Sequence, residues 1–293
     1  MPRLLISGAA GQLGGDLLDT ATARGIPAVG FSHAALDITD RTAVARALDE
    51  QGPDAVINCA AWTNVDGAES HADRAFAVNL KGARLLAEEC AQRDVLLMHL
   101  STDYVFDGES PRPIPENAAP APLSIYGASK LAGEEAVRAV SDNHVIVRTS
   151  GLYGRDGPNF LLKVLHRAAR GEQLRVVTDQ VTAPTWTGHL APALLRLIEM
   201  HATGTFHLTN SGRTSWYEFA VSGLRTAGLA SAVQPILSAE LPASARRPQH
   251  AVLDNCAWLH AGEPALPTWS VALDDYIGEL RRRGRLPASL VTA

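Results

Sequence analysis

Cysteine is scarce in this sequence, and its arrangement argues against cross-linking. The three cysteines, Cys59, Cys90 and Cys256, are odd in number and far apart, and each lies among apolar residues. This pattern predicts buried free thiols in a reducing compartment instead of disulfides. Neither a CxxC nor an HExxH motif occurs among the cysteines and the ten histidines. A structural zinc site or a zincin is therefore disfavoured, and we predict no bound metal.

Segments suited to membranes or nucleic acids are also lacking. No apolar run approaches the length of a membrane span, and the chain begins on a strand pattern without a charged and then apolar leader. The net charge is −5, and no arginine-rich block alternates with aromatic residues. The one dense basic run, residues 281–285, follows a predicted helix and suits its solvated end. We therefore expect a cytoplasmic protein that binds neither membrane nor nucleic acid.

Short apolar runs alternate with helical patterns through the first half of the chain. At 293 residues and 46% hydrophobic, the chain can bury a full core. The patterns predict strands at 3–7, 26–30, 54–60, 95–101 and 144–149, separated by helices that include 41–50, 68–90 and 123–135. This alternation predicts an α/β fold, a Rossmann-type doubly wound parallel sheet with right-handed crossovers.

The pattern loosens in the second half, where proline-rich connectors separate the elements. Helices are predicted at 160–170, 187–200, 215–227 and 271–282, and strands at 174–178 and 205–209. We infer a smaller C-terminal substrate domain that shares chain crossings with the first. Its bounds would be about 149–175 and 211–293, leaving 1–148 and about 176–210 to a nucleotide-binding domain. The cleft between the two would hold the substrate.

A glycine-rich turn follows the first predicted strand and precedes a helix. Gly8, Gly11 and Gly14 form a GxxGxxG pattern, which differs from GxGxxG but has the strand, turn and helix context of a dinucleotide site. Gly8 would permit the tight turn, Gly11 the approach of a pyrophosphate, and Gly14 close helix packing. We predict that this turn binds the phosphates of a nucleotide.

The end of the second predicted strand bears on the choice of cofactor. An acidic residue here would bind a ribose 2′-hydroxyl and repel a 2′-phosphate, but the sequence has Ser32 and His33. Both can donate to a phosphate, so we favour NADPH, with NADH also open because the usual arginine is missing. Asp37 is expected either to cap a turn or to accept from the adenine amino group.

Small or polar residues follow the third and fourth predicted strands. Ala60, Ala61 and Thr63 leave room for a ligand at the carboxyl end of a parallel strand, and residues 101–103 place hydroxyls and a carboxylate at the same edge. Asn79 lies within a predicted helix, where asparagine is disfavoured. Residues 107–124 are rich in proline, glycine and asparagine and predict a loop over a site.

Tyr126 and Lys130 lie four residues apart on a predicted helix, so their side chains share one face. Such pairs are common on helices, but Lys81, Lys130 and Lys163 are the only lysines in a chain that otherwise uses arginine. A nearby ammonium favours the phenolate, so we expect Lys130 to lower the pKa of Tyr126 and make it a general acid or base.

Several segments together resemble the extended short-chain dehydrogenase/reductases, and within them the dTDP-4-dehydrorhamnose reductase family. The likeness covers nearly the whole chain. STDYVFDG at 101–108 with YGASKLAGE at 126–134 is the most specific part, and GAAGQLG at 8–14, NCAAWTNVDGAE at 58–69, RTSGLYG at 148–154, DQVTAPTW at 179–186 and RRPQHAVLDN at 246–255 occur in the family's order.

This resemblance implies NADPH-dependent reduction of the C4 ketone of dTDP-4-dehydro-β-L-rhamnose. Tyr126 would protonate the ketone oxygen, Thr102 would hydrogen-bond it, and Lys130 would hold the nicotinamide ribose. The implied cofactor-binding residues are Gly8, Gly11, Gln12, Leu13, Gly14, Ser32, His33, Asp37, Ile38, Ala60, Ala61, Thr63, Asn79, Tyr126 and Lys130, and the implied substrate-binding residues are Asp103, Gly151 and Asn159.

One departure from the family affects the predicted substrate. Members usually have tryptophan where this sequence has Gly151, so we expect that side of the pocket to be enlarged. The same chemistry on another deoxysugar nucleotide, or on a non-sugar ketone or imine, is therefore an alternative. A non-catalytic nucleotide-binding regulatory subunit is a further one, although it would not need Tyr126, Lys130 and Thr102. Homodimerisation is left open.

Overall fold

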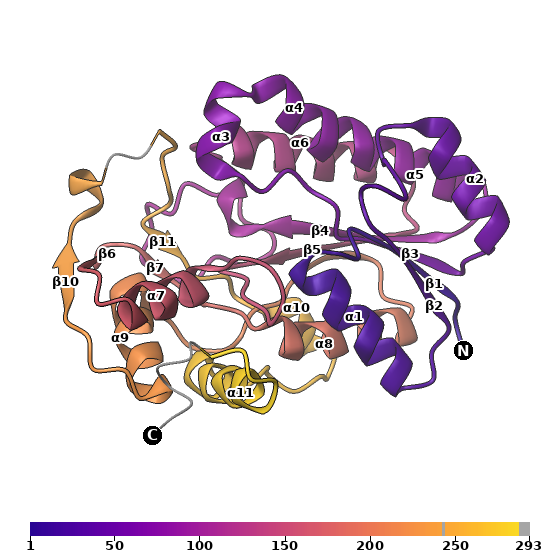
Figure 1. Ribbon diagram of the computed structural model, residues 1–293. Coiled ribbons are helices and arrows are strands. Elements are labelled where there is room, and N and C mark those ends of the chain that lie inside the picture. Colours follow the sequence, from indigo (N-terminus) through magenta and orange to yellow (C-terminus); the bar gives the residue numbers. More distant parts are fainter. Residues whose placement is uncertain (242–243, 287–293) are drawn as a thin grey trace.

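A six-stranded, wholly parallel sheet forms the centre of the computed structural model, which describes residues 1–241 and 244–286 (Figure 1). The strand order is β2-β1-β3-β4-β5-β8. The strands are β1 (Leu4–Ser7), β2 (Ala28–Phe31), β3 (Ala55–Asn58), β4 (Leu96–Thr102), β5 (His144–Thr149) and β8 (Gly204–His207). From β1 the chain adds β2 on one side of the sheet and then β3, β4 and β5 on the other. In open sheets of this kind, ligands bind at the carboxyl ends of the strands where the direction of winding changes, here between β1 and β3. The predicted fold class is confirmed.

Helices cover both faces of the sheet because the strand residues alternate between two cores. Leu4 and Ile6 of β1 pack toward α1 (Gln12–Ala23) and α8 (Thr187–Glu199), whereas Leu5 packs on the opposite side. That opposite side is covered by α2 (Arg41–Gln51), α5 (Ala83–Ala91) and α6 (Ile125–Val140). A sheet buried on both faces requires the continuous apolar runs that the sequence shows.

A separate apolar core lies beside the sheet and is built from later parts of the chain. It is enclosed by α7 (Phe160–Ala169), α9 (Trp216–Ala227) and α11 (Trp269–Arg282). Two small sheets adjoin it, one of β6 (Leu174–Val177) and β10 (Val233–Ile236), the other of β11 (His250–Ala251), β7 (Val181–Thr182) and β9 (Thr214–Ser215). The predicted N-cap of α9 is confirmed, since Ser215 and Glu218 form a capping box.

The predicted continuous helix over 68–90 is wrong. The chain instead forms α3 (Val65–Ser70), α4 (Ala72–Phe76), a π-helical turn (Ala77–Gly82) and α5. His71 interrupts the helix with non-helical backbone angles, φ −133° and ψ 47°, and the side chain of Asn79 bonds both the N–H and the C=O of Trp62. These bonds to a distant loop outweigh regular helical hydrogen bonding, as is common where π-turns occur near functional sites.

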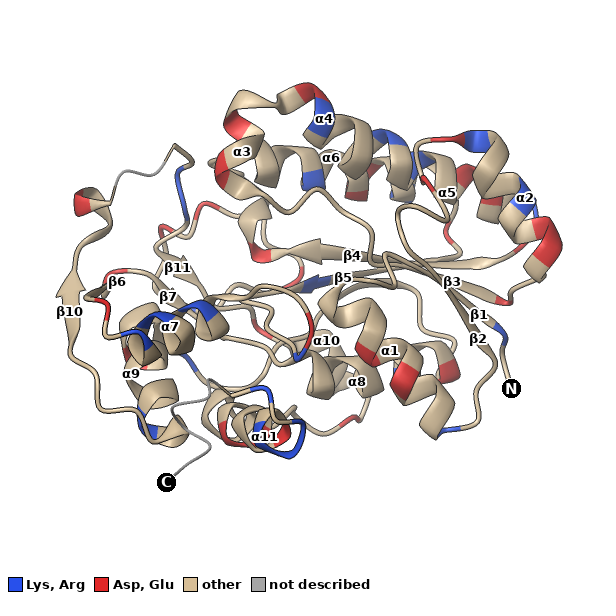
Figure 2. Ribbon diagram, viewed as in Figure 1, with Lys and Arg blue, Asp and Glu red and all other residues tan. Residues whose placement is uncertain are grey.

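Other differences are local. The short strands β7, β9, β10 and β11, the helix α10 (Cys256–His260) and the 3-10 turns Asp103–Val105 and Ser238–Glu240 were not predicted. Cys90 is buried as expected, but Cys59 and Cys256 are partly exposed. Charged residues lie mostly on helices and loops (Figure 2). None of the described helices is long and apolar enough to cross a membrane.

Candidate active site

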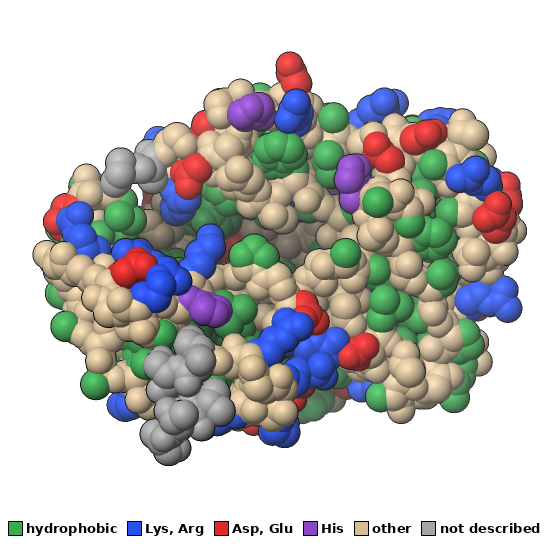
Figure 3. Space-filling view, in the orientation of Figure 1, with side chains coloured by type: hydrophobic (Ala, Val, Ile, Leu, Met, Phe, Trp, Pro, Cys, Tyr) green, Lys and Arg blue, Asp and Glu red, His purple; other side chains and the backbone are tan. Residues whose placement is uncertain are grey.

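A cavity of about 980 Å³ opens at the carboxyl ends of β1, β3, β4 and β5. On the side of the smaller core it is closed by residues 180–182, Trp216, Arg247, Pro248 and Ala251. The face shown in Figure 3 is hollowed between α3 and α4 above and α7 below. The volume suits a large organic ligand.

The glycine turn lies at one end of this cavity. Gly8 has φ +71°, and a Cβ there would come within 2.7 Å of Ala60 N. A Cβ on Gly14 would lie 2.5 Å from Gly8 O, so α1 can pack on the turn only without a side chain. Gly11 is the N-cap residue of α1 and no side chain caps the helix, whose first turn also lacks acidic residues. The free N–H groups at this end of α1 suit an anion such as a pyrophosphate.

The residues beyond β2 line the far end of the cavity. His33, Asp37 and Ile38 contact it, whereas Ser32 does not. The Asp37 carboxylate accepts from the backbone N–H and the hydroxyl of Thr39 at 2.9 and 2.8 Å, and these bonds lower its pKa. Asp37 therefore acts as a turn residue while it also borders the cavity, and only His33 remains as a predicted phosphate donor here.

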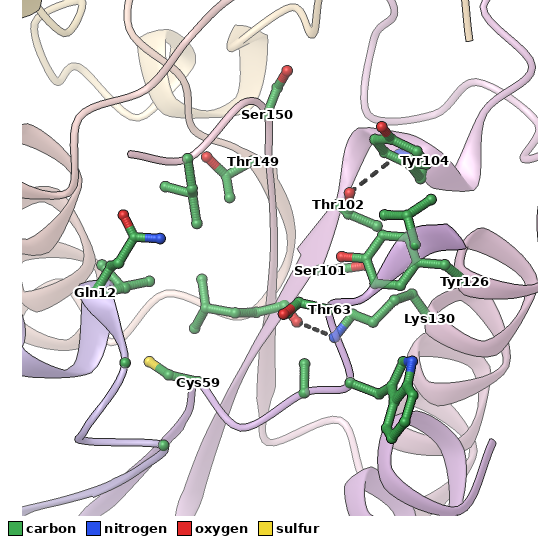
Figure 4. Close-up of a pocket in the computed structure, with 18 of the residues that line it drawn as sticks. Gln12, Cys59, Thr63, Ser101, Thr102, Tyr104, Tyr126, Lys130, Thr149 and Ser150 are labelled. Carbon is green, nitrogen blue, oxygen red and sulfur yellow. Dashed lines mark hydrogen bonds between the residues drawn. The ribbon is translucent and has the colours of Figure 1, made fainter. Parts of the chain in front are cut away.

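Tyr126 enters the cavity from the first turn of α6. Ser124 caps this helix by accepting from Gly127 N–H, and a Cβ at Gly127 would lie 2.2 Å from Tyr104 O. The turn after β4 therefore fixes the position of Tyr126 beside Thr102. Figure 4 shows Tyr126, Lys130, Thr102 and Tyr104 on one side of the cavity, with Gln12 and Cys59 across from them.

The expectation that Lys130 lowers the pKa of Tyr126 is wrong for this structure. Burial raises the pKa of the Tyr126 phenol, and only the neighbouring Thr102 hydroxyl opposes that effect. The Lys130 amine instead donates to Leu100 O at 2.6 Å and lies 3.4 Å from His99 Nε2. Burial lowers the pKa of Lys130 to about 8, against the raising effects of Glu134 and Cys59. Tyr126 therefore holds its proton at neutral pH.

Asp103 joins the sheet to the short strand β7. Its buried carboxylate accepts from Thr102 Oγ1 at 3.0 Å and from Ser150 Oγ at 3.1 Å, and Ser150 Oγ lies 2.5 Å from Thr182 Oγ1. Burial raises the pKa of Asp103 to about 6. Nearby, Thr149 Oγ1 is buried at the cavity and has no partner among residues 1–241 and 244–286. An unpaired buried hydroxyl here suits a polar ligand.

Two further predicted binding residues do not line the cavity. Asn79 bonds Trp62 and Ser129, so its side chain holds the loop that carries Ala61 and Thr63 instead of facing a ligand. Asn159 caps α7 through Leu162 N–H and bonds Gly154 O and Tyr276. In both cases the side-chain amide is hydrogen-bonded to neighbouring protein groups. The other predicted site residues do line the cavity, namely Gly8, Gly11, Gln12, Leu13, Gly14, His33, Asp37, Ile38, Ala60, Ala61, Thr63, Thr102, Asp103, Tyr126, Lys130 and Gly151.

The space beside Gly151 is not simply enlarged. Gly151 has φ +53°, and a Cβ there would lie 3.3 Å from the Cη2 atom of Trp216. Trp216 follows Ser215 at the start of α9 and borders the cavity. A tryptophan from a distant element thus borders the region where the resemblance led us to expect one at position 151.

Several residues on this side of the cavity were not predicted from the sequence, including Gln180, Thr182, Trp216 and Arg247. Arg247 Nη2 lies 2.6 Å from Asp66 Oδ2 of α3 and adds a positive charge at the cavity. Three of these residues, Gln180, Thr182 and Arg247, lie in the segments DQVTAPTW and RRPQHAVLDN, which carried the resemblance without an assigned role. Their family-like composition was the signal that could have found them.

Comparisons with known proteins agree with this geometry. The family model described as RmlD substrate binding domain matches residues 2–282. A dTDP-4-dehydrorhamnose reductase of Streptomyces griseus is 42% identical over 98% of this chain and 96% of its own. A dTDP-4-keto-6-deoxy-D-glucose reductase of Streptomyces niveus is also 42% identical, over 92% of this chain and 95% of its own.

Solved structures give the same assignment. A crystal structure of dTDP-4-dehydrorhamnose reductase from Bacillus anthracis in complex with NADP superposes with a TM-score of 0.93, at 36% identity over 95% of this chain and 99% of that one. A structure described as a dTDP-4-dehydrorhamnose reductase, RfbD orthologue, from Clostridium acetobutylicum gives a TM-score of 0.92 at 38% identity, over 95% of this chain and 99% of that one. The chain belongs to the RmlD substrate-binding-domain family, that of the dTDP-4-dehydrorhamnose reductases.

Proposed function

We propose that this chain is an NADPH-dependent reductase of a dTDP-4-keto sugar, with dTDP-4-dehydro-β-L-rhamnose as the substrate and dTDP-β-L-rhamnose as the product. The observation that carries the proposal is the buried Tyr126 beside Thr102 and Lys130, facing a cavity whose other end is the uncapped glycine turn. The dTDP-4-dehydrorhamnose reductases among the relatives support the sugar.

The residues of the cavity fit NADPH. Gly8, Gly11 and the start of α1 would hold the pyrophosphate, because no side chain fills the turn and no acidic residue opposes an anion there. His33 would donate to the 2′-phosphate, and Lys130 would hold the nicotinamide ribose. The remaining cofactor contacts would come from Gln12, Leu13, Gly14, Asp37, Ile38, Ala60, Ala61 and Thr63. When bound, the cofactor supplies the hydride.

The protein's part in the reaction is to bind and protonate the ketone oxygen. Tyr126 gives its proton to that oxygen, and the Thr102 hydroxyl turns from Asp103 to donate to the same atom. Positioned donors of this kind are commonly worth about 3 kcal/mol each, because they act on charge that develops in the transition state. Asp103 would face the sugar. The described residues of about 149–182 and 211–286 would form the substrate side of the cleft, because β7 (Val181–Thr182) also lines the cavity there.

A second candidate is a different dTDP-4-keto-6-deoxy sugar as the natural substrate. Gly151 with Trp216 beside it is a local arrangement that differs from the family pattern, and the relative from Streptomyces niveus is a dTDP-4-keto-6-deoxy-D-glucose reductase. The catalytic residues would be the same. Only the wall that contacts the sugar ring would select between the two substrates.

The two candidates separate in one experiment. Purified protein is mixed with dTDP-4-dehydro-6-deoxyglucose and NADPH or NADH, with and without the epimerase that makes the rhamnose precursor, and cofactor oxidation is followed by absorbance. We expect rapid oxidation of NADPH only with the epimerase present. Equal oxidation without it would favour the second candidate, and no oxidation with either sugar would contradict both. NMR of the product sugar identifies the configuration formed at C4.

A further inference from the structure

A row of buried polar side chains runs across the sheet behind Lys130. Ser7 of β1, Asn58 of β3 and His99 of β4 are register neighbours on adjacent strands. Each is 1% exposed, and Lys130 is 2% exposed. Polar groups this deeply buried need defined partners, so the direction of each hydrogen bond in the row can be worked out.

One backbone N–H fixes the direction of the whole row. Ala60 N–H donates to Asn58 Oδ1 at 3.1 Å, and Ser7 Oγ donates to the same oxygen at 2.7 Å. Because a peptide N–H can only donate, the amide of Asn58 cannot be turned over without directing its NH2 group at the Ala60 N–H. Asn58 Nδ2 therefore faces His99 Nδ1, at 3.1 Å.

This contact sets the tautomer of His99. An amide nitrogen only donates, so Nδ1 must accept and the ring hydrogen of the neutral imidazole lies on Nε2. Burial lowers the pKa of His99 well below its usual value, which keeps the ring neutral. Nε2 lies 3.4 Å from Lys130 Nζ. A donor thus points at the lysine nitrogen, and an ammonium group has no lone pair to accept it.

We propose that His99 is a positioning residue that donates its Nε2 hydrogen to the lone pair of Lys130, favours the neutral amine over the ammonium, and so lowers the pH at which this lysine titrates in the ligand-free site. The amine in turn donates to Leu100 O. The use of Lys130 in catalysis rests on the proposed function, whereas the state of the His99 and Lys130 pair does not.

The other charged groups near the pair do not replace this contact. Glu134 and Cys59 act on Lys130 from α6 and from the end of β3, and Arg138 and His144 act on His99 from α6 and β5. The Glu134 carboxylate is bonded to Ser101, Arg138 and Arg148, so its charge is matched within its own cluster. No other hydrogen-bond partner of His99 Nε2 occurs within residues 1–241 and 244–286.

The tautomer can be observed directly by nitrogen NMR of protein labelled on its ten histidine rings. We expect the His99 signals, identified by their loss in His99→Asn, to show a neutral ring protonated on Nε2 throughout the neutral pH range. A ring protonated on Nδ1, or on both nitrogens, would overturn the proposal. This measurement needs no substrate, so it remains informative even if the protein reduces no sugar.

The lysine state has its own readout because the chain has only three lysines. With ¹³C at lysine Cε, the Lys130 signal is assigned from Lys130→Gln and titrated with pH. His99→Asn keeps a partner for Asn58 but removes the donor to Lys130, and we expect the titration midpoint to rise by about one pH unit because hydrogen bonding to the neutral form is lost. His99→Gln, a second variant should the first fold poorly, is expected to raise it too, since its carbonyl can accept from an ammonium.

Two substitutions in the row are expected to differ in their effect on the Lys130 titration midpoint. In Asn58→Asp the second carboxylate oxygen accepts from Nδ1, which moves the ring hydrogen away from Nε2 and lets Nε2 accept from an ammonium, so the midpoint should rise further. Ser7→Ala leaves the Ala60 N–H in place and should leave the midpoint unchanged. The pH profile of kcat/KM should move in the same direction as each midpoint. Unchanged midpoints in both His99→Asn and Asn58→Asp would overturn the proposal.

Discussion

The two walls of the cavity are built in different ways. One wall comes from strand ends and from α6, and its residues Thr102, Asp103, Tyr126 and Lys130 are all buried and fall within 29 positions of the sequence. The other wall is formed by residues on loops, two-residue strands and one helix start, namely 151, 180–182, 216, 247, 248 and 251. Chemistry that needs fixed geometry is thus placed on the sheet, and contacts that can vary with the substrate are placed on connections.

Removing the acid from the sheet wall is expected to have the largest effect. Tyr126→Phe keeps the ring but loses the proton donor, so turnover should fall about 10³-fold while NADPH affinity changes little. Rates are measured by NADPH oxidation and affinity by cofactor fluorescence. Retained turnover would remove Tyr126 from its proposed role, and retained binding without turnover would exclude a purely regulatory role for the wild-type chain.

Asp103 links the two walls, and ionisation of its carboxyl group should lower the free energy of unfolding. The carboxyl has a usual pKa of 3.8 and a folded pKa of about 6. As the pH rises between these values, the unfolded chain loses its proton first, so the free energy of unfolding falls and stays low above pH 6. Asp103→Asn should therefore be more stable than the wild type by about 3 kcal/mol at pH 7, with little difference below pH 4.

Urea unfolding at several pH values tests this sign. The exposed Asp142→Asn substitution is the matched control and should leave the pH dependence of unfolding as it is in the wild type. A wild type that is more stable than Asp103→Asn at pH 7 would contradict the argument.

Breaking the second wall should affect sugar binding more than catalysis. Trp216→Ala removes the ring beside Gly151, and we expect KM for the nucleotide sugar to rise about 10-fold with kcat within about 3-fold, as for the loss of one apolar contact. Trp216→Phe should restore part of the loss. A fall in kcat with unchanged KM would place Trp216 with the sheet wall instead.

The far end of the sheet wall should show the smallest effect. His33→Asp places a carboxylate where the 2′-phosphate is expected, so the ratio of kcat/KM for NADPH over NADH should fall about 10-fold, with kcat nearly unchanged at saturating cofactor. His33→Gln retains a donor and is the control. A ratio that stays the same in His33→Asp would remove His33 from the phosphate site.

The sheet wall was the part that the sequence could predict. The glycine turn, the residues after β3 and β4, and the cap and spacing of α6 are local patterns, so the contacts that position Tyr126 and Lys130 follow from short stretches of chain. The resemblance to a known family then predicted which reaction these residues carry out. Neither the local patterns nor the resemblance required knowledge of how distant segments of the chain pack.

The second wall and the electrostatics could not be predicted in this way. Trp216 lies 65 positions from Gly151, and no local pattern indicates that its ring approaches that turn. The π-turn at Asn79 depends on hydrogen bonds to Trp62, which is distant in the sequence. The side chain of Asn159 donates to the hydroxyl of Tyr276, which is also distant. The pKa of Tyr126 was predicted in the wrong direction because burial, and the turning of Lys130 toward Leu100 O, are tertiary effects.

Two positions without side chains decide where α6 lies. Gly127 touches Tyr104 O, and a Cβ on Gly133 would lie only 2.1 Å from Asn79 O in the π-turn. Tyr126 and Lys130 are thus held close to both points of attachment, and any side chain at either glycine would push the helix away and carry both groups with it. Variants that adapt this enzyme to new sugars should therefore accumulate changes elsewhere, while these two glycines stay fixed.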